Sequence, residues 1–175
     1  MNRWIFGYGS LIWRPNIEYL ERHPARLAGW QRRFWQGSHD HRGVPSCPGR
    51  VVTLAPEAGV YCDGIAYLLD QGVVEETFQD LDVREKNGYE RHNVSMQLLD
   101  ASSCKKGLVY IAPVGNHAFL GPASLPDMVQ QILQCVGPSG TNVDYLLQLA
   151  AALRQLNAID PHVFELEAAV LQELK

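Results

Sequence analysis

The chain of 175 residues is long enough to bury a sizeable core, and 46% hydrophobic against 19% charged residues is typical of a globular protein. A formal charge of −4, from 15 basic and 19 acidic residues, gives no general reason to expect a nucleic-acid partner. No apolar run reaches the about 20 residues that span a bilayer, and Gly7 to Ser10 interrupt the only stretch that resembles a signal sequence. We therefore expect one domain over residues 1–175, in the cytoplasm, with no membrane and no obligate protein partner.

Cysteine usage agrees with a cytoplasmic location. The four cysteines are widely spaced and form neither a CxxC pair nor a Cys/His metal spacing; they are Cys47, Cys62, Cys104 and Cys135. Because disulfides are rare in the cytosol, we expect reduced thiols here and no metal site.

Strand-like patterns dominate the chain up to about residue 112. Residues 3–8 alternate, with Trp4, Phe6 and Tyr8 on one face. Short apolar or alternating runs bounded by Pro, Gly or Asp predict further strands at 27–36, 50–55, 64–70, 89–99 and 108–112.

One helix is expected inside this β region, over residues 73–84. Val74, Phe78 and Leu81 recur there at helical spacing. The dipeptide Asn87-Gly88 supplies a stop signal, because both residues tolerate a positive φ.

The rest of the chain has helical patterns with recognisable starts. Ser124 is a predicted N-cap, Thr141 or Asn142 can cap the next helix, and Asp160-Pro161 opens a last helix running to the C-terminus. Strands followed by helices predict a mixed α+β domain whose helices pack on the outside of the sheet.

The stretch WIFGYGSLIW raises the first functional question. An apolar strand breaks at Gly7-Tyr8-Gly9-Ser10 and becomes hydrophobic again at Leu11. One interpretation is an ordinary turn, and the other is a loop whose backbone N–H groups approach an anion or a developing oxyanion. The spacing fits neither GxxxxGK[ST] nor GxGxxG, so a nucleotide loop is not expected.

Glu85 is the second candidate, because it lies at the predicted C-terminal end of a helix. The negative end of a helix disfavours a carboxylate, and a partly dry site would raise its pKa toward the range of a general acid or base. The alternative is a solvent-facing glutamate between Arg84 and Lys86.

The stretch GSHDHRGVPSCPGRVVTL is the third candidate. His39 and His41 look like a metal pair, but no third ligand of matching character is evident, so we expect surface residues. Arg42 and Arg50 are candidates for holding a carboxylate, which guanidinium groups bind bidentately. No GxSxG nucleophile elbow is present, and Ser10 has no evident His/Asp partner.

Several stretches together resemble a known family. In order they are FGYGSLIW, RRFWQGSHDHRGVPSCPGRVVTL, REKNGYE, LGPASLPDMVQQI and GPSGTNVDYLLQLAAALRQL. They resemble the short form of the ChaC family of glutathione-specific γ-glutamylcyclotransferases, from Trp4 to at least Phe164. The resemblance implies a mixed β-barrel-like sheet wrapped by helices. It also implies a lyase that releases 5-oxoproline and cysteinylglycine from glutathione, with no metal or organic cofactor.

The resemblance also assigns roles to residues. It implies that Glu85 is catalytic, that the backbone of Tyr8, Gly9, Ser10 and Leu11 binds the γ-glutamyl group, and that Tyr145 lines the pocket. Two positions depart from the family pattern: Val83 stands where an aromatic residue is expected, and Asn87 replaces the first glycine of a Gly-Gly-Tyr sequence. These departures bear on packing beside the glutamate and on efficiency.

Two other functions remain open at this stage, and one further role follows from the substrate. The chain could be a cyclotransferase for other γ-glutamyl compounds, or a non-catalytic regulator of cation transport. If glutathione is the substrate, Arg42 is the candidate that would clamp its glycine carboxylate.

Overall fold

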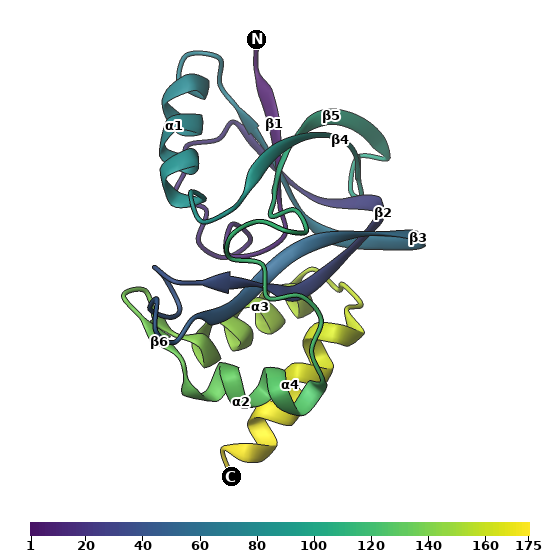
Figure 1. The fold of residues 1–175 in the computed structure, drawn as a ribbon. Helices are drawn as coiled ribbons and strands as arrows, with labels where there is room; N and C mark the ends of the chain where they lie inside the picture. The colour runs from purple at the N-terminus through teal and green to yellow at the C-terminus, as the bar shows by residue number, and fades with distance from the viewer.

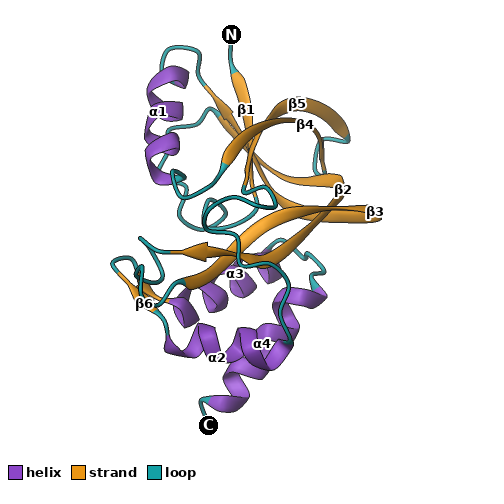
Figure 2. Ribbon diagram, in the orientation of Figure 1, coloured by secondary structure: helices purple, strands orange, loops and turns teal.

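The computed structural model describes all 175 residues as a closed five-stranded barrel packed against helices (Figure 1). The barrel has the strand order β1-β3-β2-β4-β5; β1 and β5 pair in parallel, and all other pairs are antiparallel. Helix α1 lies apart from α2, α3 and α4, which gather under the long strands (Figure 2). The elements are β1 Arg3–Gly7, β2 Glu21–Ser38, β3 Gly49–Leu69, α1 Val74–Arg84, β4 Glu90–Leu98, β5 Ser103–Ile111, α2 Leu125–Gln134, β6 Val136–Gly137, β7 Gly140–Thr141, α3 Asn142–Gln155 and α4 Pro161–Glu173.

Strands β2 and β3 are much longer than the sequence predicts. The prediction of separate strands at 50–55 and 64–70 was wrong, because β3 runs through both and pairs with β2 along its length. Its central residues are exposed and so lack apolar alternation. Gly29 and Gly59, both with positive φ, lie where the register between β2 and β3 shifts. A β-bulge at this point lets the two strands stay paired although the alternating sequence pattern is interrupted.

The helix predictions were confirmed more closely. Helix α1 begins one residue after the predicted start and ends at the predicted Arg84. Ser124 Oγ accepts a hydrogen bond from the Asp127 N–H at 3.2 Å, and Thr141 Oγ1 accepts from Asp144 at 3.0 Å, so Thr141 and not Asn142 is the cap. Strands β6 and β7, of two residues each, were not predicted.

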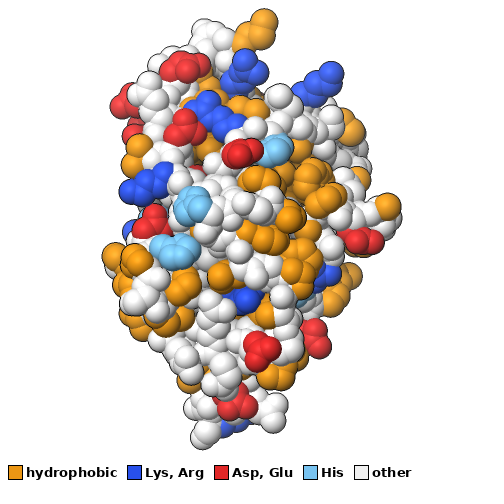
Figure 3. Space-filling view, in the orientation of Figure 1, with side chains coloured by type: hydrophobic (Ala, Val, Ile, Leu, Met, Phe, Trp, Pro, Cys, Tyr) orange, Lys and Arg blue, Asp and Glu red, His pale blue; other side chains and the backbone are white.

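A single hydrophobic cluster of 36 buried residues joins the barrel to the helices. Phe6 and Ile12, on either side of the glycine break in WIFGYGSLIW, both belong to it. On the face shown in Figure 3, acidic and basic side chains are interspersed and form no patch of one sign. No helix combines the length and apolar character needed to cross a bilayer.

The structure has the four cysteines as free thiols. Cys47 and Cys135, 88 positions apart in sequence, place their Sγ atoms 2.7 Å from each other. This contact joins the loop after β2 to the end of α2.

Asn142 attaches α3 to the barrel. Its side chain is fully buried; Oδ1 accepts a hydrogen bond from the Arg50 N–H, and Nδ2 donates to the Arg50 carbonyl, both at 2.7 Å. One amide side chain therefore satisfies both backbone groups of a residue in β3. This fixes the start of α3, and with it Tyr145 one turn later, against the strand.

Asn142→Ala should lower the free energy of unfolding by about 3 kcal/mol, because the N–H and carbonyl of Arg50 lose their buried partners. Asn142→Asp keeps an acceptor but places a buried carboxylate oxygen against the Arg50 carbonyl, so its loss should be at least as large. Urea denaturation measures both. The exposed Gln148→Ala on the same helix is the control, with an expected change within about 0.5 kcal/mol. A loss for Asn142→Ala no larger than for the control would contradict this assignment.

Candidate active site

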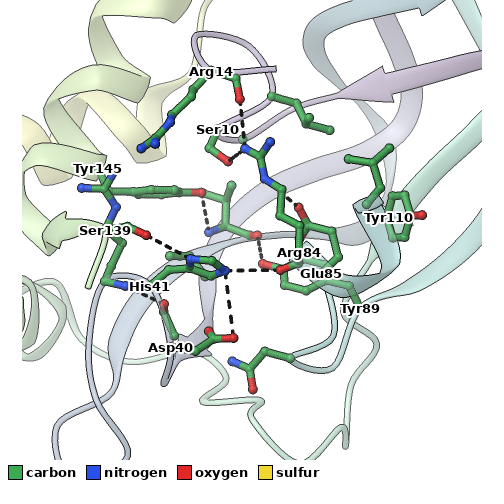
Figure 4. Close-up of a pocket in the computed structure, with 18 of the residues that line it drawn as sticks. Ser10, Arg14, Asp40, His41, Arg84, Glu85, Tyr89, Tyr110, Ser139 and Tyr145 are labelled. Atoms are coloured by element: carbon green, nitrogen blue, oxygen red, sulfur yellow. Dashed lines mark hydrogen bonds and ion pairs between the residues drawn. The ribbon is translucent and has the colours of Figure 1, made fainter. Parts of the chain in front are cut away.

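A cavity of about 290 Å³ lies where the end of β1, the end of α1 and the start of α3 meet. The six residues to which the family resemblance gives roles all line it: Tyr8, Gly9, Ser10, Leu11, Glu85 and Tyr145. Figure 4 shows Ser10, Glu85 and Tyr145 around this cavity, with Arg84 between Ser10 and Glu85. Residues from distant parts of the sequence thus meet in one hollow.

The loop after β1 has an asymmetric hydrogen-bond pattern. Each of its four carbonyls has a donor in the protein: Tyr8 O accepts from Arg32, Gly9 O from Ile12, Ser10 O from Arg14 and Leu11 O from Tyr67. The N–H groups of Gly9, Ser10 and Leu11 donate to no acceptor in the protein. Unpaired N–H groups beside a cavity, with every carbonyl already occupied, make a receptor for an anion or an oxyanion.

Close packing explains the glycines of this loop. A Cβ atom on Gly9 would lie 3.1 Å from both the Tyr145 hydroxyl and Val52 Cγ2, and one on Gly7 would lie 2.7 Å from Leu11 Cβ. The two glycines therefore let the backbone turn sharply and approach Tyr145. The interpretation of this stretch as an ordinary turn accounts for neither the free N–H groups nor the cavity beside them.

Arg84 holds the loop in place from the end of α1. Its Nη2 donates to Ser10 Oγ at 2.7 Å and to the Arg14 carbonyl at 3.0 Å, and its Nη1 donates to the Pro15 carbonyl at 2.9 Å (Figure 4). One guanidinium group thus spans the whole turn, and the next residue in sequence is Glu85.

Glu85 carries a largely buried carboxylate with few partners. Its side chain is 18% exposed and accepts no hydrogen bond; the nearest cation is Arg84 Nε, 3.6 Å from Oε1. Burial raises the pKa of Glu85 to about 7; nearby Arg84 opposes the shift, and the charge of Asp40 adds to it. The alternative of a solvent-facing glutamate is therefore wrong. A carboxyl group with a pKa near neutrality suits proton transfer in both directions.

Tyrosines form the walls of the cavity. The Tyr145 hydroxyl accepts from the Val52 N–H at 3.3 Å, and the Tyr89 hydroxyl donates to the Val52 carbonyl at 2.7 Å. The Tyr8 hydroxyl donates to the Tyr110 carbonyl at 2.7 Å. These bonds hold the three rings in place. The Tyr8 and Tyr89 hydroxyls use their protons within the protein, whereas the Tyr145 hydroxyl only accepts and its proton has no acceptor there.

The arginines and histidines of the GSHDHRG stretch divide into different roles. Arg50 lies outside the cavity and donates to the Phe34 and Gly121 carbonyls, so the expectation that it can hold a substrate carboxylate was wrong. Arg42 lines the cavity. His41 Nδ1 lies 3.0 Å from Ser139 Oγ, and no group of three or more His, Cys, Asp or Glu side chains could hold a metal ion.

The two departures from the family pattern have different consequences. Val83 is 68% exposed, so it does not pack beside the glutamate and the expected loosening there is absent. Asn87 Nδ2 donates to the Gly37 carbonyl at 2.8 Å, which ties the turn after α1 to β2. Asparagine thus provides an anchor that glycine would lack, while Gly88 supplies the positive φ.

Several cavity residues were not identified from the sequence: Arg14, Asp40, Tyr89, Tyr110 and Ser139. Asp40, Tyr89 and Ser139 lie inside the stretches that carried the resemblance, and that resemblance was the only signal in the sequence for them. Arg14 and Tyr110 lie outside those stretches, and no local pattern marks them.

Comparison with known proteins agrees with this geometry. A crystal structure of a γ-glutamyl cyclotransferase specific to glutathione from yeast superimposes with a TM-score of 0.90 at 31% identity, covering 98% of this chain and 96% of the other. A structure named γ-glutamyl cyclotransferase, at 14% identity and a TM-score of 0.59, shares the fold. The barrel and its cavity therefore define the γ-glutamylcyclotransferase fold class.

Sequence comparison specifies the family within that class. The family model described as ChaC-like protein matches residues 3–173. A zebrafish (Danio rerio) protein named glutathione-specific γ-glutamylcyclotransferase 1 is 41% identical, covering 98% of this chain and 90% of its own length. A Saccharomyces cerevisiae protein named glutathione-specific γ-glutamylcyclotransferase is 34% identical over 87% of this chain and 86% of its own. The chain belongs to the ChaC-like family.

The raised pKa of Glu85 predicts a pH-dependent stability. The folded state binds this proton more tightly than the unfolded state, whose pKa is 4.5, so the contribution is complete below pH 4.5 and is lost as the pH rises through about 7. The shift corresponds to about 3 kcal/mol. Relative to the wild type, Glu85→Gln should gain about that much stability between pH 4.5 and 8.

Denaturation curves at several pH values measure this difference. The exposed Glu57→Gln should give a difference from the wild type that stays nearly constant over the same range. A Glu85→Gln difference equally flat with pH would show that Glu85 titrates normally.

Proposed function

We propose that this chain is a γ-glutamylcyclotransferase that converts glutathione to 5-oxoproline and cysteinylglycine. The observation that carries the proposal is one juxtaposition: the donor-free carboxylate of Glu85 and the unpaired N–H groups of Gly9, Ser10 and Leu11 line the same cavity. A base and an oxyanion receptor are the two components that this reaction needs. The names of the yeast and zebrafish relatives agree with the proposal.

The reaction is an intramolecular acyl transfer. The α-amine of the γ-glutamyl group attacks its own side-chain carbonyl, a five-membered ring closes, and the cysteine nitrogen leaves. No water is consumed and no covalent bond to the enzyme forms. Because nucleophile and electrophile belong to one molecule, holding a folded conformer supplies a large part of the rate enhancement.

Glu85 serves as the proton carrier. The α-amine is protonated near neutral pH, so the ionised carboxylate first removes a proton from it. The protonated carboxyl group then donates to the leaving nitrogen as the C–N bond breaks. The regenerated carboxylate takes the second proton from the ring nitrogen and passes it to the released amine, which restores the starting state of Glu85. A group with a pKa of about 7 exists in both forms at the working pH and so can perform both steps.

The loop after β1 stabilises negative charge. The N–H groups of Gly9, Ser10 and Leu11 are assigned to the γ-glutamyl group, either to its α-carboxylate or to the oxyanion of the tetrahedral intermediate. In comparable sites a single preorganised donor contributes about 3 kcal/mol to the transition state. Tyr8 and Tyr145 enclose the same group and exclude water from it.

The same proposal places the reaction in the cytoplasm. The substrate is a thiol peptide that the cytosol maintains in reduced form. The four free thiols of the chain suit that environment.

Purified protein incubated with glutathione should release cysteinylglycine and 5-oxoproline in equal amounts. Glu85→Gln should lower kcat by about 10²- to 10⁴-fold, because the neutral amide cannot accept the proton. Chromatographic quantification of both products measures this, and Glu57→Gln is the control with unchanged rates. Full activity of Glu85→Gln, with the fold intact by circular dichroism, would rule out the mechanism.

The pH dependence provides a separate test of the same role. Because the ionised form of Glu85 starts the reaction, kcat/KM should fall about tenfold per pH unit below a midpoint near 7. Initial rates between pH 5 and 8 measure this acid limb. A rate independent of pH over that interval would exclude Glu85 as the base.

A further inference from the structure

The cavity is lined by more charged groups than the γ-glutamyl group requires, with Asp40 and Asp80 in addition to Glu85 on the acidic side. Besides Arg84, which the loop after β1 uses, both Arg14 and Arg42 line it. Figure 4 shows the Arg14 side chain reaching toward Tyr145 and away from Glu85. Glu85 therefore lies away from Arg14, and Arg42 lies beside the Tyr145 ring toward which Arg14 reaches.

Arg42 is buried without a counterion. It is only 6% exposed, and no carboxylate lies within ion-pair distance of it. Of the five N–H donors that a guanidinium group carries, one has a partner: Nη1 donates to the Thr141 carbonyl at 3.1 Å. None of the remaining nitrogens is sealed inside the protein without a partner, so they face the cavity.

The comparison with Arg32 shows how unusual this is. Arg32 is equally buried, but it forms an ion pair with Asp160 and donates to the Tyr8 and Asp63 carbonyls. A buried charge is costly unless a partner compensates for it. Arg32 has its partners inside the protein. Arg42 has no such counterion, and an incoming anion can supply one.

Arg14 supplies a second cation beside Arg42. Its side chain makes no hydrogen bond or ion pair, while its backbone is fixed: its N–H donates to Ser10 O at 2.7 Å and its carbonyl accepts from Arg84. Burial is the main cause that lowers the pKa of Arg42; the charges of Tyr145 and Asp144 oppose it, and repulsion from Arg14 makes a smaller contribution in the same direction as burial. Arg14 is exposed, and both arginines line the same cavity.

Tyr145 connects the two ends of the cavity. Its hydroxyl lies at Gly9 and Val52, beside the loop assigned to the γ-glutamyl group. The centroid of its ring lies 5.8 Å from Arg42 Cζ, on the way to the start of α3. Two extended residues span about 7 Å, so a dipeptide running along this ring would bring its terminal carboxylate to the arginines.

From this geometry we infer that Arg42, assisted by Arg14, binds the C-terminal carboxylate of the leaving dipeptide. The inference rests on the proposed function and names the residue of the same site that recognises the far end of the substrate. A γ-glutamyl amino acid ends one residue too early to reach Arg42. These contacts do not involve the central side chain of the substrate. An analogue with 2-aminobutyrate in place of cysteine should therefore still be a substrate.

Two substrate analogues test the subsite in the wild-type protein. One is glutathione with its glycine carboxylate converted to a carboxamide, and the other is γ-glutamylcysteine. For each, kcat/KM should be about 10- to 100-fold below that of glutathione. For the amide, most of this decrease should come from a higher KM. The analogue with 2-aminobutyrate should stay within about threefold of glutathione. An amide turned over as efficiently as glutathione would overturn the inference, even though glutathione turnover itself supports the proposed function.

Variants locate the interaction. Arg42→Met should lower kcat/KM for glutathione about 10- to 100-fold. It should change kcat/KM for the amide less than threefold, because the amide already lacks the carboxylate that Arg42 binds. Arg14→Met should act in the same direction with a smaller effect. Equal losses on both substrates would show that the arginines support the fold instead.

Two further variants keep this test decisive. Arg42→Lys retains the charge but loses the planar fork, so it should recover part of the discrimination if Arg42→Met is poorly folded. Arg3→Met replaces an exposed arginine at the start of β1 and should alter neither substrate. If Arg42→Lys and Arg14→Met both discriminate the two substrates as the wild type does, the inference fails.

Discussion

The arrangement of the site depends on one set of hydrogen bonds, those of the Arg84 guanidinium group. It donates to Ser10 Oγ and to the Arg14 and Pro15 carbonyls, and so joins the end of α1 to the turn after β1. Glu85 follows directly in sequence, so the bonds that fix the turn also fix the position of the carboxylate. The same guanidinium group lies 3.6 Å from Glu85 and limits the rise of its pKa without neutralising it.

A second joint completes the cavity from the opposite side. The long strands β2 and β3 carry the loop with Arg42 away from the barrel, and Asn142 fastens α3 to β3 by pairing with the Arg50 backbone. Tyr145 is thereby held across the cavity between Gly9 and Arg42. In the proposed mechanism, the barrel end provides the chemistry, and the helical end provides the surface along which the rest of the substrate extends.

Local signals in the sequence predicted much of this fold, and their limits are physical. Caps and helical spacing predicted the helices because those are local interactions, whereas the continuity of β3 through its exposed centre depends on pairing with β2. Sequence position drew attention to Glu85, but only burial shows that its pKa is raised. The sequence offered the N–H loop at Gly9 as one of two interpretations and Arg42 as a candidate clamp. It could not decide between the alternatives, because whether these groups lack a partner depends on residues distant in the sequence.

The central claim is that Glu85 and the loop after β1 act on the same γ-glutamyl group. A crystal structure of Glu85→Gln with glutathione bound tests it most directly, because the variant should bind the substrate without consuming it. The account predicts the α-amine within about 3 Å of the side-chain oxygen of residue 85, with γ-glutamyl oxygens on the N–H groups of Gly9, Ser10 and Leu11. A γ-glutamyl group bound away from that loop, or an α-amine out of reach of residue 85, would contradict it.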